Sequence, residues 1–204
     1  MGDNGRVPRI NAPTLAEHQA QRRADVVGAA VDLLIGSGPA AVTPAAVAAA
    51  AGLARSSVYQ YFPSTGALVA VAVEQAFARA TAALGAALAG AGTPGDRVSA
   101  YVDAALDAAI DGHRPMASLA GADLPAECRD RVAELHDQML EPLVAALRDL
   151  GVDDAAGVAG LVNAVLVAAA GQVVRGEAGT VVRQRVRRFV LAATGAGPEA
   201  PGSG

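Results

Sequence analysis

The segment from Thr43 to Leu68, TPAAVAAAAGLARSSVYQYFPSTGAL, constrains the possible folds of this chain more than any other part of it. Two short stretches of helix-forming residues lie on either side of Gly52, and glycine readily adopts the positive φ that a tight turn requires. Ala48 is small enough to let a second helix cross the first, and Val58 can fill the core between them. The same core would be completed by Val47, Ala51 and Leu53. The spacing predicts a helix-turn-helix.

One face of the second predicted helix has no packing role. Its residues can all donate hydrogen bonds and none is acidic: Arg55, Ser56, Ser57, Tyr59, Gln60 and Tyr61. Arginine can bind the O6 and N7 edge of guanine, glutamine can do the same for adenine, and hydroxyls suit phosphate oxygens. Thr43 is a predicted N-cap, so it places free backbone amides where a phosphate could dock. The pattern indicates a helix that reads a major groove.

The run GLARSSVYQYFPSTGAL resembles the signature of the TetR (tetracycline-repressor) family of transcriptional regulators. In that family a turn glycine leads into a recognition helix that ends Tyr-x-(His/Tyr)-Phe. The matching positions are Gly52, Val58, Tyr59, Tyr61, Phe62 and Leu68. The resemblance covers about residues 14–70. It implies base contacts from Arg55, Ser56 and Gln60, and phosphate contacts from Thr43, Ser57, Tyr59 and Tyr61.

Thr65 departs from the family pattern, which usually has a phosphate-binding lysine at the start of the fourth helix. Thr65 keeps a hydroxyl that can donate, but a positive charge is missing. Loss of that charge would weaken non-specific DNA binding and make its salt dependence shallower. Arg6 and Arg9, on the N-terminal arm, could compensate by reaching phosphates or the minor groove.

Glycine and proline divide the chain into helical stretches, and no stretch alternates as a strand would. Thr14 and Glu17 fit a capping box at the first helix, and Pro142 should kink a later one. Helices are expected over about 15–35, 44–51, 55–61, 65–89, 95–111, 114–121, 125–149, 154–175 and 179–193. The predicted fold is all-α with about nine helices: an N-terminal three-helix head with the helix-turn-helix, followed by a helical bundle.

Four parts are expected along the chain. They are a disordered arm (1–13), a DNA-binding domain (14–66, motif about 44–63), a ligand-binding and dimerisation domain (67–194) and a disordered tail (195–204). The first 66 residues carry five arginines and four acids, a net charge of +1. Because the whole chain has a net charge of −4, the remainder has a net charge of −5. This asymmetry is in the direction expected of a DNA-reading head, but it is mild.

The stretch from 155 to 174 contains no charged residue and is long enough to cross a bilayer. It is rich in Ala, Gly and Val and contains Asn163 and Gln172, which favours a buried subunit interface over a membrane span. The resemblance implies a four-helix homodimer interface made by helices 154–175 and 179–193. In the second of these, one apolar stripe is predicted from Val182, Val186, Phe189, Val190 and Ala193, flanked by Arg183, Arg185, Arg187 and Arg188. An intramolecular core for these helices and a nucleic-acid patch at RQRVRR remain open alternatives.

The resemblance also implies a dimeric repressor that binds a palindromic operator in double-stranded DNA and is switched by a small-molecule effector. Candidate pocket residues are Tyr101, His113, Met116, His136, Met139 and Asn163, with Arg114 and Gln172 as further polar candidates. Low aromatic content, 3%, argues against a pocket built to stack large planar molecules. The identity of the effector does not follow from the sequence.

Enzymatic activity is not expected. Neither a GxSxG elbow, nor a Walker loop, nor an HExxH motif occurs, and the three histidines and the carboxylates lack metal-ligand spacing. We therefore expect no cofactor and no metal, and Cys128 is expected to be buried. The N-terminal sequence lacks the apolar region of a signal peptide, so a cytoplasmic bacterial protein is expected. The alternative function is a helical interaction or anti-repressor module that has lost DNA binding.

Overall fold

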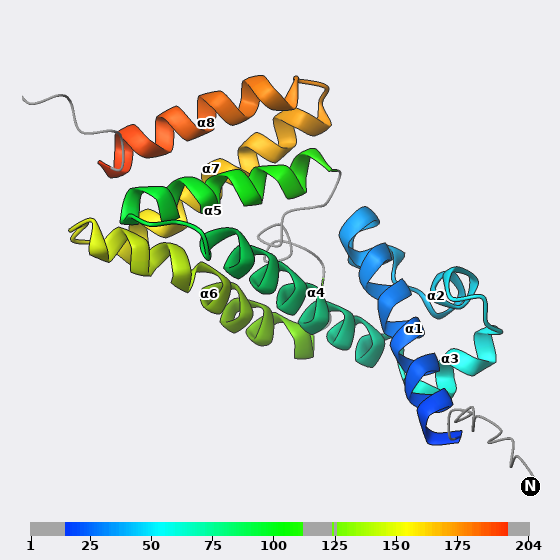
Figure 1. Cartoon of the computed structure of the whole chain (residues 1–204). Helices are drawn as coiled ribbons and strands as arrows, with labels where there is room; N and C mark the ends of the chain where they lie inside the picture. The colour runs from blue at the N-terminus through cyan, green and yellow to red at the C-terminus, as the bar shows by residue number, and fades with distance from the viewer. Residues whose placement is uncertain (1–14, 112–123, 125, 196–204) are drawn as a thin grey trace, which may run out of the picture.

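The computed structural model describes residues 15–111, 124 and 126–195 (Figure 1). Within these ranges the chain forms eight α-helices and one short 3-10 helix, and no strand. Their bounds are α1 (Leu15–Ser37), η1 (Pro39–Ala41), α2 (Pro44–Ala50), α3 (Arg55–Tyr61), α4 (Thr65–Leu88), α5 (Pro94–Ile110), α6 (Ala126–Asp149), α7 (Ala155–Val174) and α8 (Gly179–Thr194). The prediction of an all-α fold is confirmed.

The predicted helices that fall in the described residues all form, with ends within two residues of the prediction. The short helix η1 was not predicted, because the Gly-Ser-Gly-Pro sequence that leads into it reads only as a helix stop. Several predictions lie outside the described residues: the arm with Arg6 and Arg9, Thr14 and its capping box, the helix at 114–121, and the tail beyond Gly195.

Side-chain caps explain where two helices of the head region begin. The hydroxyl oxygen of Thr43 accepts a hydrogen bond from the amide of Ala46 at 3.2 Å, and Pro44 follows at the first helical position. The hydroxyl oxygen of Ser64 accepts from the amide of Ala67 at 3.0 Å, which fixes the start of α4. Both caps satisfy amides that would otherwise lack a partner within the helix.

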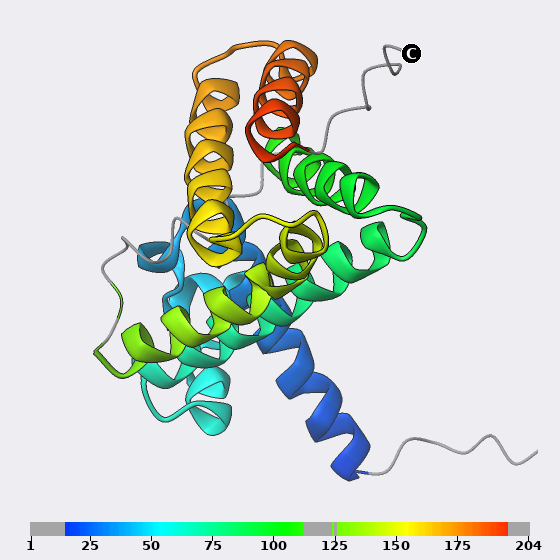
Figure 2. The same cartoon turned by 90° about the vertical axis from the view of Figure 1, so that its left-hand side faces the viewer.

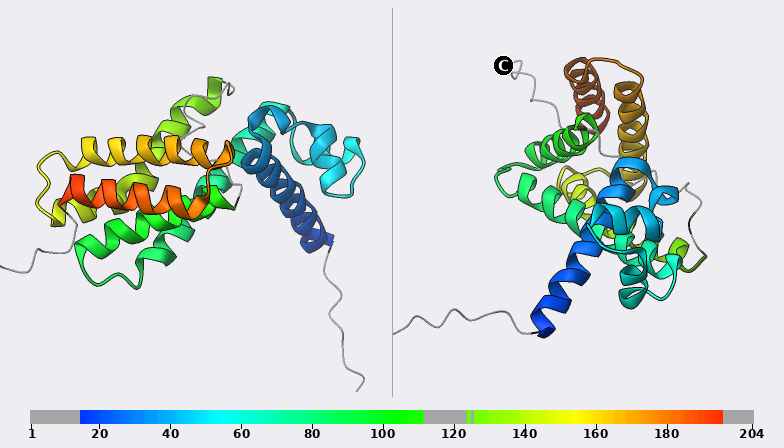
Figure 3. Two further views of the ribbon diagram at one scale, coloured as in Figure 1. Left: turned by 90° about the horizontal axis from the view of Figure 1, so that it is seen from above. Right: turned by 90° about the vertical axis from the view of Figure 1, so that its right-hand side faces the viewer.

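The head consists of α1, η1, α2 and α3, and it lies at one end of the molecule (Figures 1 and 3). The predicted apolar stripe of α1 is buried, with Val31 fully buried and Leu34 exposing 1% of its surface. Facing side chains from the other head elements close this core: Val42, Val47, Val58 and Phe62. Helix packing around one apolar stripe thus fixes the relative positions of the three head helices.

The body is a bundle of α4 to α8, and α4 joins it to the head (Figure 2). Helix α4 packs against α1 on the head side and against α5 and α6 in the body. The largest side chains buried in the body include Phe77, Tyr101, Leu106, Leu143 and Leu147. Helix α6 runs continuously through Pro142. Because α4 contacts both parts, a shift of the body helices can be transmitted to the head.

Two of the described helices, α4 and α7, are long and apolar enough to cross a membrane. Length and composition are weak evidence, because the core helix of a soluble protein passes the same test. Both helices pack against neighbours in the bundle: α4 against α1, α5 and α6, and α7 against α5, α6 and α8. Apolar side chains of both helices are therefore buried against neighbouring helices.

Three of the five positions of the predicted α8 stripe are buried within the chain. Val182, Val186 and Val190 are buried, but Phe189 exposes 57% of its surface and Ala193 is also exposed. The buried row continues to Thr194, so it follows steps of four residues. Each such step rotates the buried face by about 40°, because an α-helix turns about 100° per residue. Phe189 is consequently left at the edge of the face that packs on the bundle.

Ion pairs hold the outer side of α8 to α5. Arg183 pairs with Asp107, and Arg187 pairs with Asp103 at 3.2 Å. Arg185 pairs with Glu177 at 3.1 Å. Three of the four α8 arginines thus form ion pairs with acidic residues of the same chain. This argues against the alternative of a nucleic-acid patch at this helix.

Candidate nucleic-acid interface

The turn between α2 and α3 has the geometry that the sequence predicts. Gly52 adopts a φ of +66°, in the left-handed region that disfavours residues with a Cβ atom. Nothing lies within 4 Å of where its Cβ would be, so the backbone conformation alone accounts for glycine here. The amide of Leu53 donates to the carbonyl of Ala48 at 2.8 Å and closes the turn.

A small core sets how α3 leans on α2. Val47, Ala48 and Val58 are buried, with 2% or less of their surfaces exposed. Val58 is the only buried residue of α3. Ala51 and Leu53 are half-buried at the edge of this core. Helix α3 therefore packs through one fully buried valine, and most of its other side chains face outward.

The eight residues predicted to contact DNA all reach the surface. Six of them are exposed: Thr43, Arg55, Ser56, Tyr59, Gln60 and Thr65. Ser57 and Tyr61 are half-buried, and Tyr61 packs against the head core. The structure thus presents an outward face of α3 with hydrogen-bond donors and no carboxylate, flanked by Thr43 and Thr65 at the starts of α2 and α4.

Two arginines of the head lie over aromatic rings. The guanidinium carbon of Arg55 is 6.0 Å from the ring centroid of Tyr59, one turn along α3. The guanidinium carbon of Arg23, in α1, is 5.1 Å from the ring centroid of Phe62. Sequence reasoning did not single out Arg23. The available signal was its spacing, because position 23 continues the buried row of Val27, Val31 and Leu34 toward the N-terminus by one turn.

Two of the predicted pocket residues in the body contact each other. The Nε2 atom of His136 in α6 lies 3.0 Å from the side-chain nitrogen of Asn163 in α7. Burial lowers the pKa of His136, although the charge of Asp137 raises it in part. Met139 is buried in the same helix as His136.

Tyr101 is buried in α5, where it exposes 1% of its surface, and burial raises its pKa to about 12. The helices that carry Tyr101, His136 and Asn163 pack against one another. The candidates His113, Arg114 and Met116 lie outside the described residues.

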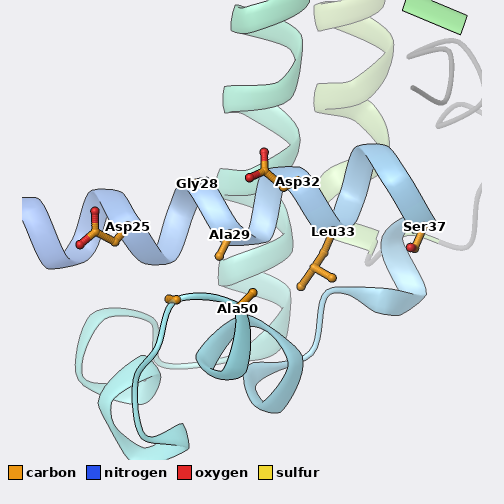
Figure 4. Close-up of a pocket in the computed structure, with 8 residues that line it drawn as sticks. Asp25, Gly28, Ala29, Asp32, Leu33, Ser37 and Ala50 are labelled. Atoms are coloured by element: carbon orange, nitrogen blue, oxygen red, sulfur yellow. The ribbon is translucent and has the colours of Figure 1, made fainter. Parts of the chain in front are cut away.

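A groove of about 560 Å³ lies between α1 and the C-terminal end of α2 (Figure 4). It is lined by Asp25, Gly28, Ala29, Asp32, Leu33, Ser37, Ala50 and Ala51. Both carboxylates already have partners in the chain: Asp25 accepts from Gln21 at 2.8 Å, and Asp32 pairs with Arg79 of α4 at 3.3 Å. Sequence reasoning did not predict this groove, and its polar groups do not point to a ligand.

Residues 90–95, GAGTPG, fit the letters of the dinucleotide-binding pattern GxGxxG, a match that sequence reasoning missed. In the structure they follow helix α4 and run into the first residues of α5, whereas a dinucleotide site requires a strand before the glycines. Thr93 instead caps α5: its hydroxyl donates to Asp96 at 2.7 Å and accepts from the Asp96 amide at 3.1 Å. The segment is therefore a helix–helix connection with a local cap.

Comparison with protein families places the head in a known group. The family model for bacterial regulatory proteins of the tetR family matches residues 26–72. A search of curated proteins finds no significant match to the sequence.

Solved structures share the fold over most of the chain. A TetR transcriptional regulator from Chloroflexus aurantiacus is 22% identical, with a TM-score of 0.75, covering 86% of this chain and 94% of that one. A TetR transcriptional regulator from Legionella pneumophila is 16% identical, with a TM-score of 0.70 and coverage of 90% and 99%. The superantigen pfit is 18% identical, with a TM-score of 0.61 and coverage of 82% and 87%. At these identities the likeness concerns the fold.

The match of the head to the tetR model and the likeness of the whole described chain to TetR regulators agree with the geometry of α2, the turn and α3. Residues 26–72 thus match the N-terminal domain of tetR-family regulatory proteins, and the chain shares the all-α fold of solved TetR regulators.

Proposed function

We propose that the chain is a sequence-specific transcriptional regulator that reads its DNA operator with α3. The observation that carries this proposal is the outward face of α3, where every polar side chain can donate and none is acidic. An α-helix about 10–12 Å across fits a major groove about 12 Å wide. Arg55 would bind a guanine edge and Gln60 an adenine edge, with Ser56 as a third base contact.

The remaining hydroxyls of this face would set the register on the DNA backbone. Phosphate contacts are proposed from Thr43, Ser57, Tyr59, Tyr61 and Thr65. Thr43 and Thr65 are exposed at the first turns of α2 and α4, on either side of α3 in the sequence. Hydroxyl contacts to phosphate position a helix without reading bases.

We also propose that two copies pair through α7 and α8. Leu161 in α7 and Phe189 in α8 expose 69% and 57% of their surfaces, and a second copy that covered them would remove this apolar surface from water. Ala164 and Ala168 are exposed on α7 as well, and their small size would allow a close approach of helices. A twofold dimer presents α3 twice, so the expected operator is palindromic.

A small molecule bound among α5, α6 and α7 is the proposed effector. Tyr101, His136, Met139 and Asn163 are the described candidates to contact it, and His113 and Met116 are candidates outside the described residues. Its binding would shift the population of head positions through α4 and so change DNA affinity. We propose that the protein acts as a repressor in the bacterial cytoplasm and that it is not an enzyme.

Selection of DNA tests the central proposal. The wild-type protein is mixed with a pool of random duplexes, bound duplexes are recovered and sequenced, and the best duplex is used in gel shifts. We expect a palindromic consensus and a discrete shifted band. Arg55→Ala should weaken binding by about 1–3 kcal/mol and relax the preference at one base of each half-site.

Arg148→Ala is the matched control, because Arg148 is an exposed arginine of α6, in the body and outside the proposed dimer interface. It should leave both affinity and base preference unchanged. If no consensus emerges from the random pool, the DNA-binding proposal fails, and the alternative of a helical interaction module takes its place.

A further inference from the structure

The arginines of the described residues differ sharply between head and body. In the body, ten arginines are described and seven form ion pairs with acids of the chain: Arg79, Arg97, Arg131, Arg148, Arg183, Arg185 and Arg187. In the head, three are described, Arg22, Arg23 and Arg55, and none of them has an ion-pair partner within the described part of the chain. All three described arginines of the head therefore lack an ion-pair partner, against three of the ten in the body.

The first turns of α1 project from the head. Residues 16–25 are all exposed, and burial begins only at Val26 (Figures 2 and 3). Arg23 lies in this projecting part, three and four residues before the buried Val26 and Val27. It therefore shares their face of the helix and is directed toward the other head helices.

Arg23 meets the end of α3. Its guanidinium carbon lies 5.1 Å from the ring centroid of Phe62, which directly follows the last residue of α3 and exposes only 3% of its surface. The contact holds the long arginine side chain against the junction between α3 and α4 while Arg23 itself stays exposed. A positive charge is thus fixed beside one end of the recognition helix.

The last turn of α3 and the first turn of α4, which meet at that end, carry no cation of their own. Arg55 lies at the opposite end of α3, and the first turn of α4, Thr65 to Leu68, carries no charge. A helix seated in a major groove has a row of phosphates along each side, and each must be met by a donor or a cation for tight binding.

We propose that Arg23 is a phosphate-contact residue of the DNA interface, held in place by stacking on Phe62. This inference rests on the proposed function, because it requires that α3 lies in a major groove. Arg23 contributes affinity and salt dependence but no base preference, since phosphates carry no sequence information. The chain thereby supplies from α1 a charge that α4 lacks.

Salt titration of DNA binding tests the assignment. The duplex is the best binder that wild-type protein selects from the random pool, and its dissociation constant is measured between 50 and 300 mM salt. Arg23→Met keeps an unbranched apolar chain over Phe62 and removes the charge. We expect the slope of log K against log salt to become shallower by about 1.8 per dimer, about 0.9 for each of two lost phosphate contacts.

Three further variants separate the possible causes. Arg23→Lys should restore most of the slope, because it restores the charge. Arg148→Met, the same charge change at an exposed position of α6 outside the proposed dimer interface, should leave the slope unchanged. Arg55→Met should alter the base preference, whereas Arg23→Met should not. Melting temperatures of all four variants confirm that each is folded.

The outcomes distinguish the two proposals. If wild-type protein selects no duplex, the proposed function fails and this inference falls with it. If wild-type protein binds and Arg55→Met changes the base preference, but Arg23→Met has the wild-type slope, only the role of Arg23 is overturned. A loss of slope in Arg148→Met equal to that in Arg23→Met would also overturn it, because the effect would then reflect net charge.

Discussion

The imidazole Nε2 of His136 and the side-chain nitrogen of Asn163 form a 3.0 Å contact between α6 and α7. The amide can donate to this ring nitrogen only while the ring nitrogen is unprotonated. Burial favours the same neutral state, because it lowers the pKa of His136. A polar contact between two body helices therefore depends on a histidine that stays neutral.

This contact predicts a pH dependence of stability. The folded protein holds the pKa of His136 below its ordinary value of 6.5, so the unfolded chain binds a proton more readily at mildly acidic pH. Stability should therefore fall as the pH drops through 6.5 and below. We expect His136→Gln to lose less stability than wild type between pH 7.5 and pH 5.5, measured by urea unfolding. His18→Gln, at an exposed position of α1, is the control and should follow the wild-type curve.

The two members of this contact were predicted as separate pocket candidates, but their pairing was not. They are 27 residues apart on different helices, and helical periodicity says only which face of its own helix a residue occupies. Which faces meet is decided by the packing of the whole bundle. The same limit applies to Phe189: an apolar residue at heptad spacing fits an inner face of α8 and an outer one equally well.

Gly52, in contrast, can be identified from the sequence alone, because a tight turn between two helices requires a residue that readily adopts a positive φ. We expect Gly52→Ala to destabilise the protein by about 1–2 kcal/mol, the cost of a left-handed conformation for a residue with a Cβ atom. Thermal or urea unfolding measures the change, and DNA binding should weaken with it because the turn orients α3. Gly85→Ala is a matched control, since Gly85 is exposed inside α4 with nothing within 4 Å of a Cβ. That change should stabilise by about 0.5–1 kcal/mol.

Helix boundaries were also predictable from local chemistry. Pro44 after Thr43, and the Phe-Pro-Ser sequence before α4, mark helix starts that the structure reproduces with side-chain caps. Arg23 shows where such reasoning stops. Its spacing places it on the inner face of α1. The spacing does not identify Phe62 as its partner, because that contact depends on how α1 crosses the end of α3.

The ion pair between Arg187 and Asp103 should contribute modestly to the attachment of α8. Both side chains are partly exposed, at 50% and 29%, so solvent screens their attraction. A double-mutant cycle of Arg187→Ala and Asp103→Ala, read by urea unfolding, should give a coupling of about 0.5–1 kcal/mol at low salt. The coupling should shrink in 1 M salt. A cycle that pairs Arg188→Ala with Asp103→Ala should give no coupling, and an equal value there would contradict the pairing.

Phe189 offers the sharpest test of the proposed dimer. Phe189 exposes 57% of its surface at the edge of the α8 face whose valines pack on the bundle. Phe189→Asp should therefore leave the fold of one copy intact but place a charge where the second copy would bury an apolar ring, at a large desolvation cost. We expect a monomer by light scattering, an unchanged helix signal by circular dichroism, and weaker operator binding because only one half-site is engaged at a time. Ala82→Asp, at an exposed position of α4, is the control and should remain dimeric. A dimer that survives Phe189→Asp at micromolar concentration would place the subunit interface elsewhere.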